Sequence, residues 1–429
     1  MKKIVNYFLI LLCLLTVVGC KKETVELVDI SDLTYDEIVE YYGTDLTINP
    51  KYTPTNQYLP NTVIGYENHE VNDLVDKESE VTVLISAKPE NAVSFDERVA
   101  YVSKIGLLTG NDSEKNGQLL FDAGISGTDL GISFDFKGKT VYLFGDTFSS
   151  PNRQGTWYSN FIAVSEENEF YDGIDFSEVI TTSRGMAKPF LQGAHNDGHP
   201  TDNSVEVTKI PTGAVTIGDT VYLFYMSVRY WGVAGSWNVN YNQCLKSTDL
   251  YNWEEVEGLR WTEDLAYNFG QIYPLDDPNS DYIYIYGIPG GRNVKMVCGR
   301  VLKSDMENFE KYEYEVADNE WVSGSEGLIE LHQNPYYLTE NRAAEQCITY
   351  NPYLGKYMLL NSVGGVWMFT ADKPYQKFED KVLLFDGSVA GVYGPFTCPN
   401  LYEENGKAFY LVGSEWGIYN VHVFKIVLN

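Results

Sequence analysis

Five copies of one short phrase constrain the fold of this chain more than any other feature of its sequence. Each copy is a polar turn followed by an apolar run that contains a tyrosine, which is the pattern of a tight β-hairpin. The marker tyrosines are Tyr142, Tyr222, Tyr284, Tyr357 and Tyr410. A strand-like run precedes each turn and another follows each marker run. Each repeat therefore predicts a meander of at least three antiparallel strands.

The flanking strands can be placed by residue number. The runs before the turns are Leu130–Phe136, Ile210–Ile217, Ile272–Leu275, Cys347–Tyr350 and Asn400–Tyr402. The runs after the marker strands cover residues 160–165, 243–247, 296–302, 365–370 and 420–427. Five meanders in series predict an all-β fold, a five-bladed β-propeller over residues 93–429. A β-sandwich also uses many short strands, but it does not need the same phrase five times.

The fifth repeat reaches only its third strand by residue 429, which would leave an unpaired sheet edge. The alternating segment Val99–Val102 lies just ahead of the first repeat and is suited to fill that edge. We expect this segment to pair with residues 420–428 and to close the ring.

The first residues have the order of an export signal. Lys2 and Lys3 precede an apolar stretch that ends at Gly19-Cys20. The alternative interpretation is a membrane-spanning anchor helix, but the stretch is shorter than the roughly 20 apolar residues that such a helix needs. We expect residues 1–19 to be a signal peptide and Cys20 to carry a lipid, as in a bacterial lipobox. The expected location is a bacterial membrane, at the outer membrane and cell surface.

Residues 20–92 match none of the five repeats. They are acidic, they contain Asn49-Pro50 and Thr53-Pro54, and they offer one short helical candidate at Thr34–Tyr42. This composition predicts a lipidated tether with some local order.

Charge excludes one class of partner. The formal net charge is −29, and removal of Lys2 and Lys3 with the signal makes it −31. Such a chain repels phosphate backbones and anionic headgroups, so nucleic acid is not an expected partner. The chain is expected to be a monomer. Aromatic residues make up 14% of the sequence, which suits β-strands and also suits stacking against sugar rings.

Four cysteines remain once Cys13 leaves with the signal and Cys20 is acylated. They are Cys244, Cys298, Cys347 and Cys398. They are widely spaced, lack any Cys-x-x-Cys pair and lie in apolar runs. Buried free thiols are therefore expected rather than disulfides.

In a propeller meander, the first strand begins and the second strand ends at the same rim of the central channel. Polar residues 12 or 13 positions before the marker tyrosines are Asp129, Lys209, Gln271, Glu345 and Thr397. The ends of the second strands add Asp146, Arg229, Arg292, Glu415 and Trp416. Any one of these could be a solvated loop residue. Together they place three carboxylates, Asp129, Asp146 and Glu345, where acid–base cleavage of a glycoside would need them.

A histidine-containing segment, His195–Asp202, offers two imidazoles four residues apart and nearby carboxylates, which could bind a metal. Gly198 and Pro200 argue against a helix there, so an insertion loop is the favoured interpretation. No Walker loop, dinucleotide fingerprint or nucleophile elbow occurs in the sequence, and no metal or cofactor is expected.

Several motifs resemble those of glycoside hydrolase family 183, formerly domain-of-unknown-function family 4185. They are Gly127-Thr128-Asp129-Leu130-Gly131, Phe144-Gly145-Asp146-Thr147-Phe148, Ile210-Pro211-Thr212-Gly213, Gly291-Arg292 and Tyr419-Asn420-Val421. The resemblance runs from about residue 94 to the C-terminus. It implies a five-bladed propeller with endo-D-arabinofuranase (endo-D-arabinanase) activity on α-linked D-arabinan.

The resemblance also implies roles for individual residues. Asp129 is the expected general base or nucleophile and Glu345 the expected general acid, with Asp146 as the substitute acid. The expected substrate-binding residues are Gln271, Arg292, Trp237, Lys209 and Trp416. Inversion is favoured over retention. Two alternatives remain: a non-catalytic, glycan-binding surface lipoprotein, and a glycosidase for another furanoside polysaccharide.

Overall fold

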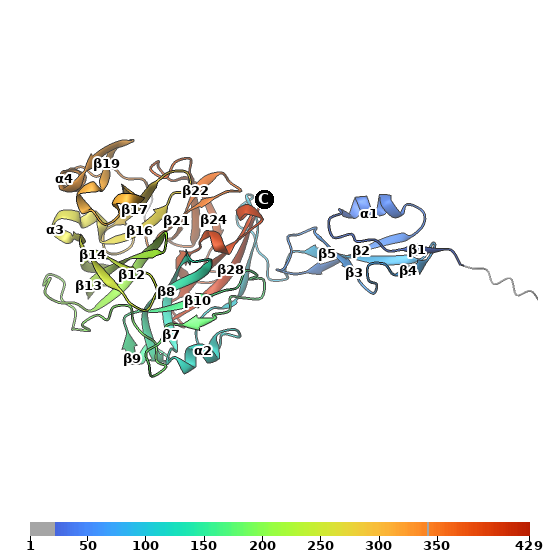
Figure 1. Ribbon diagram of the computed structural model, residues 1–429, viewed down its shortest axis with the longest axis horizontal. Helices are drawn as coiled ribbons and strands as arrows, with labels where there is room; N and C mark the ends of the chain where they lie inside the picture. The colour runs from blue at the N-terminus through green and yellow to red at the C-terminus, as the bar shows by residue number, and fades with distance from the viewer. Residues whose placement is uncertain (1–21, 341–342) are drawn as a thin grey trace, which may run out of the picture. The chain divides into compact units, whose positions relative to one another are not determined.

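The computed structural model describes residues 22–340 and 343–429, and the chain divides into two compact units at Ala87/Lys88 (Figure 1). The predicted signal peptide and Cys20 lie outside the described residues. The described chain is mostly β, with 48% strand and 10% helix, which confirms the all-β class. Among the described residues, every helix is too short or too polar to span a membrane.

The first unit contains a three-stranded sheet, a two-stranded sheet and one helix among its described residues. Its elements are β1 (Thr24–Glu26), α1 (Tyr35–Tyr42), β2 (Thr47–Pro54), β3 (Val63–Tyr66), β4 (Leu74–Asp76) and β5 (Glu80–Ala87). Strand β5 is central, parallel to β2 and antiparallel to β3, while β1 pairs with β4. Helix α1 begins with a capping box in which Thr34 and Glu37 bond each other's backbone N–H, as its sequence predicts.

This unit is more ordered than the expected tether with some local order. Val81, Val83 and Ile85 alternate along β5 and are buried together with Ile38 of α1, so the segment has a hydrophobic core of its own. Pro50, which suggested a tether, lies in β2, an edge strand of the three-stranded sheet. An edge strand tolerates proline because half of its N–H groups have no ladder partner.

The second unit contains five antiparallel sheets among its described residues. The first sheet is β7 (Gly127–Phe136), β8 (Lys139–Ser150), β10 (Phe161–Ser165) and β11 (Glu178–Val179), with β9 (Gln154–Tyr158) on β8. The second is β12 (Thr208–Ile217), β13 (Thr220–Trp231), β14 (Trp237–Ser247) and β15 (Glu254–Thr262). The third is β16 (Gln271–Asp276), β17 (Tyr282–Ile288), β18 (Val297–Leu302), β19 (Glu313–Ala317) and β20 (Glu320–Ser323).

The last two sheets complete the series. The fourth is β21 (Cys347–Asn351), β22 (Lys356–Ser362), β23 (Val366–Ala371) and β24 (Glu379–Phe385). The fifth is β25 (Val392–Phe396), β27 (Ala408–Glu415), β28 (Asn420–Leu428) and β6 (Val99–Leu107), with β26 (Tyr402–Glu403) on β27. Helices α2 (Gly117–Asp122), α3 (Glu263–Ala266) and α4 (Gly324–Gln333) lie in the connections.

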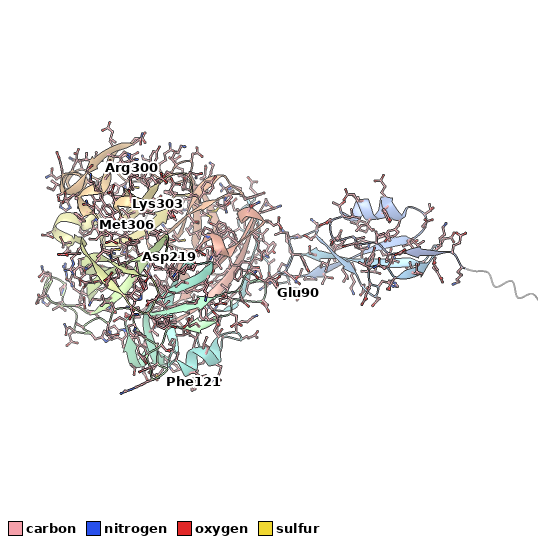
Figure 2. The ribbon with its side chains drawn as sticks, in the orientation of Figure 1. Glu90, Phe121, Asp219, Arg300, Lys303 and Met306 are labelled. Carbon is pink, nitrogen blue, oxygen red and sulfur yellow. The ribbon has the colours of Figure 1, made fainter. Side chains whose placement is uncertain are left out.

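The repeated phrase builds the second strand of every sheet. Each marker tyrosine is buried in one of β8, β13, β17, β22 and β27. The hairpin turns before them use positive φ where glycine allows it, 78° at Gly138 and 60° at Gly218, next to Asp219 in Figure 2. The first strands contact one another in a closed order, β7 to β12, β16, β21, β25 and back to β7. The five sheets therefore surround a common centre.

The closing strand occupies the predicted place. Strand β6 pairs antiparallel with β28, with Val102 opposite Ile426 and Tyr101 opposite Val427. This pairing confirms the expectation for Val99–Val102, and it covers the edge that β28 would otherwise expose.

The first strand of the fifth sheet differs from the prediction. It is β25, whereas Asn400–Tyr402 was expected to fill that place. Residues Pro399–Leu401 form a 3-10 turn with proline at its start. Proline has no N–H to donate and its φ suits the first position of a helical turn, so the strand ends before it.

The cysteine prediction is confirmed. Cys244, Cys298, Cys347 and Cys398 are buried free thiols. Each is packed in the core of the second unit, where burial raises the thiol pKa.

Candidate active site

The five sheets share one cavity of about 570 Å³. Residues from four of the sheets and from the connection into the fourth line it, including Ile210 of β12 and Phe396 of β25. Seven of the eight predicted site residues are among them: Asp129, Asp146, Glu345, Gln271, Arg292, Trp237 and Trp416. The expectation that first strands begin and second strands end at one rim, the rim rule, thus selected residues up to 287 positions apart in the chain.

Lys209 is the exception, and its predicted role in substrate binding is not supported. Its Nζ forms an ion pair with Glu206, 2.6 Å from Oε1, and it does not line the cavity. Successive residues of a strand face opposite sides. In β12 the neighbouring Thr208 instead points toward the cavity, where its hydroxyl lies 2.6 Å from Asp146.

Asp129 projects into the cavity from an irregular part of β7. The β7–β8 ladder shifts register on both sides of Leu130, whose φ is 70°. Such a bulge redirects side chains. Gly145 of β8 leaves the room that the carboxylate needs, since a Cβ there would overlap Asp129 Oδ1. Tyr393 of β25 donates its hydroxyl to Oδ2 at 2.9 Å.

The surroundings of Asp129 disfavour its charge. Desolvation inside the cavity raises the pKa of Asp129 to about 7, and the negative charge of Glu345 acts in the same direction. The hydrogen bond from Tyr393 and the charge of Arg292 act against this rise. Asp129 therefore holds its proton up to a higher pH than an aspartate in water does.

Asp146 lies near the end of β8 and is 8% exposed. Its Oδ1 accepts two hydrogen bonds, from Trp157 Nε1 at 2.7 Å and from Thr208 Oγ1 at 2.6 Å. Burial raises the pKa of Asp146 to about 8, and the nearby charge of Asp129 adds to the rise. The two aspartates are thus electrostatically coupled, and Asp146 holds its proton more tightly.

Glu345 has a different environment. Both of its oxygens accept N–H groups of Arg292, with Nε at 2.9 Å from Oε2 and Nη2 on Oε1. The guanidinium also lies over the rings of Tyr393 and Trp237, with centroid distances of 4.7 and 5.5 Å. A two-point bond to arginine is made by a carboxylate rather than by a carboxylic acid.

Gln271 and Trp237 shape the wall near this ion pair. Gln271 Nε2 donates to the backbone oxygens of Pro289 and Gly291, both at 3.2 Å, and so holds the turn that leads to Arg292. Trp237 packs edge-to-face on Trp231 at 5.7 Å.

Aromatic residues also line the cavity, and the rim rule identified Trp416 but not Trp231. Trp231 is 41% exposed and Trp416 is 59% exposed, so both present ring surface to solvent. Arg153 stacks on Trp416 at 4.4 Å. The repeated phrase gives no signal at the strand positions of Trp157, Tyr393 and Trp231. Tyr419, in contrast, lies inside a motif already noted in the sequence.

The segment His195–Asp202 is an extended loop, as favoured from its glycine and proline. Its two imidazoles face different partners. The His195 ring stacks on Trp157 at 3.8 Å, while His199 Nδ1 accepts the backbone N–H groups of Thr201 and Asp202. Within residues 22–340 and 343–429, no group of three or more His, Cys, Asp or Glu side chains is arranged to hold a metal ion.

The chain is similar to several solved structures. A candidate hydrolase from Bacteroides ovatus ATCC 8483 superimposes with a TM-score of 0.52 at 14% identity, covering 76% of this chain and 90% of that one. A GH43_1 enzyme from Xanthomonas citri gives 0.42 at 12% identity, covering 70% and 87%. A family 117 glycoside hydrolase from Zobellia galactanivorans gives 0.41 at 13%, covering 77% and 92%. At 14% identity, the likeness to the Bacteroides protein is one of fold.

Sequence comparison is more specific. No curated protein matches the chain. One family model matches residues 116–425, which include the aspartate pair, the Arg292–Glu345 ion pair and all five marker tyrosines. The chain therefore belongs to the family described as domain of unknown function DUF4185.

Proposed function

We propose that the second unit is a five-bladed β-propeller glycoside hydrolase in which Asp146 and Asp129 carry the acid–base chemistry. The observation that supports this most strongly is the pair of buried, coupled carboxyl groups with pKa values of about 8 and about 7 in an aromatic cavity. The propeller assignment rests on five meander sheets whose first strands contact one another in a closed order.

Asp146 is the proposed general acid. Its higher pKa keeps it protonated at neutral pH, as the donor to a leaving glycosidic oxygen must be. Asp129 is the proposed general base, because the hydroxyl of Tyr393 stabilises its ionised form. In the proposed single displacement, water attacks the anomeric carbon and gives a proton to Asp129. The glycosidic C–O bond breaks, and the departing oxygen takes the proton of Asp146.

This assignment changes the role proposed for Glu345. Both Glu345 oxygens are engaged by Arg292, so this residue is poorly placed to supply a proton. We propose that the ion pair orients the sugar through Arg292, whose positive charge also opposes the rise that the charge of Glu345 causes in the pKa of Asp129.

The proposed substrate is α-linked D-arabinan, cleaved at internal linkages. Its basis is the motif resemblance to glycoside hydrolase family 183, together with exposed rings of Trp231 and Trp416 suited to stacking on furanose units. A lipid on Cys20 would hold the enzyme at a bacterial membrane, at the cell surface, where a polymer too large to be imported can be cut.

A non-catalytic glycan-binding protein would use the same aromatic rings. It would have no use for two coupled, buried carboxyl groups, whose burial costs folding free energy. This cost favours the enzyme.

The test is digestion of D-arabinan by the purified second unit, with released oligosaccharides followed by chromatography. A panel with plant L-arabinan and other furanosides tests linkage, and NMR of the first anomer released tests inversion. Release from D-arabinan that is lost in Asp146→Asn, with glycan binding retained, supports the proposal. Binding without release by the wild type would show the non-catalytic alternative to be right.

A further inference from the structure

Trp157 connects the histidine loop to the proposed general acid. Its indole Nε1–H donates to Asp146 Oδ1 at 2.7 Å. Its ring contacts Phe148, which lies opposite it in the β8–β9 ladder with centroids 5.9 Å apart. It also contacts His195, with centroids only 3.8 Å apart and ring planes 8° apart. Of these two contacts, the stack on His195 is the closer and the more nearly parallel.

We propose that His195 is a positioning residue, which holds the Trp157 ring so that its indole N–H stays bonded to Asp146. This inference rests on the role proposed for Asp146 and extends it to the loop 195–202, which the chemistry had left without a function.

The His195 ring is itself fixed. Its Nε2 lies 2.9 Å from Ser159 Oγ and 3.1 Å from Gln192 Nε2, and the same Ser159 oxygen accepts the backbone N–H of Gly193 at 2.8 Å. Burial lowers the pKa of His195, so the ring is neutral at neutral pH and can accept from the serine hydroxyl. The backbone supports this placement, since the N–H of His195 donates to Val207 O at 3.0 Å.

Few charged or titratable groups face His195 and Asp146. Glu206 faces His195, and it is paired with Lys209 and also accepts the backbone N–H of Ala194 at 3.2 Å. Asp146 is faced by Asp129 and by the phenol of Tyr419. Lys209, which does not reach the cavity, thus acquires a structural part in anchoring the loop.

The stack has a chemical consequence. An N–H donor stabilises an ionised carboxylate, so the indole bond lowers the pKa of Asp146 from the value that burial alone would impose. A Trp157 ring that can rotate away makes this bond intermittent. The pKa of Asp146 then rises, and its carboxyl group is less well oriented toward the glycosidic oxygen.

The experiment compares ring loss with ring retention. His195→Ala removes the ring, His195→Gln keeps a polar group for Ser159 without a ring, and His195→Phe keeps a ring without that hydrogen bond. His199→Ala is the matched control in the same loop, because the His199 imidazole accepts backbone N–H groups of Thr201 and Asp202 within that loop. The readouts are the pH dependence of kcat/KM on D-arabinan and the 15N-indole NMR signal of Trp157, assigned with Trp157→Phe.

In His195→Ala and His195→Gln, the alkaline limb of the profile should move up by about one pH unit, the size of one lost hydrogen bond to a charged group. The indole signal should titrate with the same shifted midpoint. His195→Phe and His199→Ala should match the wild type. Adding His195→Ala to Trp157→Phe should cause no further shift, because the two act through one contact.

Two results would overturn the inference. One is a wild-type alkaline limb and indole midpoint in His195→Ala; the other is a wild-type limb in His195→Gln with a shifted limb in His195→Phe. If no variant and no wild type cleaves the glycan, the NMR titration still decides. An indole midpoint that depends on Asp146 and on His195 supports the positioning role, and an indole signal indifferent to His195 refutes it.

Discussion

Two regions of the same cavity hold carboxyl groups in opposite ways. On the first sheet, Asp129 and Asp146 lie close to each other, receive hydrogen bonds from neutral donors and have raised pKa values. On the far side of the ring, Glu345 is paired with Arg292 through two nitrogen atoms. Burial is the main cause of the raised pKa values of the two aspartates, whereas Glu345 is held by the guanidinium of Arg292, so the two regions are suited to different roles.

The largest expected effect is on turnover. Asp129→Asn should lower kcat on D-arabinan by about 10²–10⁴-fold, the range for loss of an acid–base group. Asp135→Asn on the same strand is the matched control, since Asp135 is exposed and accepts from Asn400 outside the cavity. Initial rates of oligosaccharide release measure both. Retention of a tenth of the wild-type rate in Asp129→Asn would contradict the role of base.

The pH profile should report the coupled pair. kcat/KM should fall below about pH 7 as Asp129 gains a proton, and above about pH 8 as Asp146 loses one. The two midpoints belong to the pair, because each charge shifts the other group. An optimum near pH 5 with activity lost by pH 7 would show that these groups do not carry the reaction.

Matched amide substitutions should change stability in opposite directions. The pKa of Asp146 is raised on folding from 3.8 to about 8, so its contribution to stability is lost as pH rises through that interval. Asp146→Asn removes this loss and should raise Tm, with an advantage that grows from pH 5 to pH 8.

The second of these amide substitutions, Glu345→Gln, leaves the Arg292 guanidinium without its anion. The substitution should lower the free energy of unfolding by about 1–3 kcal/mol. This is less than for a fully buried pair, because the Arg292 side chain is 27% exposed. Thermal melts of both variants across pH make the comparison. A loss of stability in Asp146→Asn at pH 8 would contradict the raised pKa.

The smallest expected effect concerns the aromatic surface. Trp231→Ala should raise KM for D-arabinan about fivefold, the loss of about 1 kcal/mol of stacking, with little change in kcat. Tyr267→Ala is the control, because Tyr267 is similarly exposed but does not line the cavity. Equal KM values in the two variants would remove Trp231 from the binding site.

The sequence predicts much of the fold because the repeated phrase combines turn chemistry with strand alternation, and both are local. The same locality allowed the rim rule to find Asp129, Asp146 and Glu345. It failed at Lys209, since a shift of one residue along a strand turns a side chain to the other face. Arg229, Thr397 and Glu415, which the rule also selected, likewise do not line the cavity. The folded first unit was not predicted either, because prolines on an edge strand obscured the short alternating pattern of its core.

Pairings between distant segments could not be predicted from local pattern. Tyr393 reaches Asp129 from the fifth sheet, and Arg292, which follows the last strand position of β17 in the third sheet, engages Glu345 just ahead of the fourth sheet. These contacts decide which acid keeps its proton. They arise only when the sheets come together, so the sequence favoured Glu345 as the acid whereas the geometry favours Asp146.

One comparison tests the central proposal most directly: digestion of D-arabinan at pH 7.5 by the wild type, Asp146→Asn and Glu345→Gln, with glycan binding and folding verified for each. We predict that Asp146→Asn loses at least about a hundredfold in kcat. We predict that Glu345→Gln mainly raises KM and keeps most of its turnover. A Glu345→Gln variant without turnover beside an active Asp146→Asn variant would contradict the proposal and make Glu345 the acid.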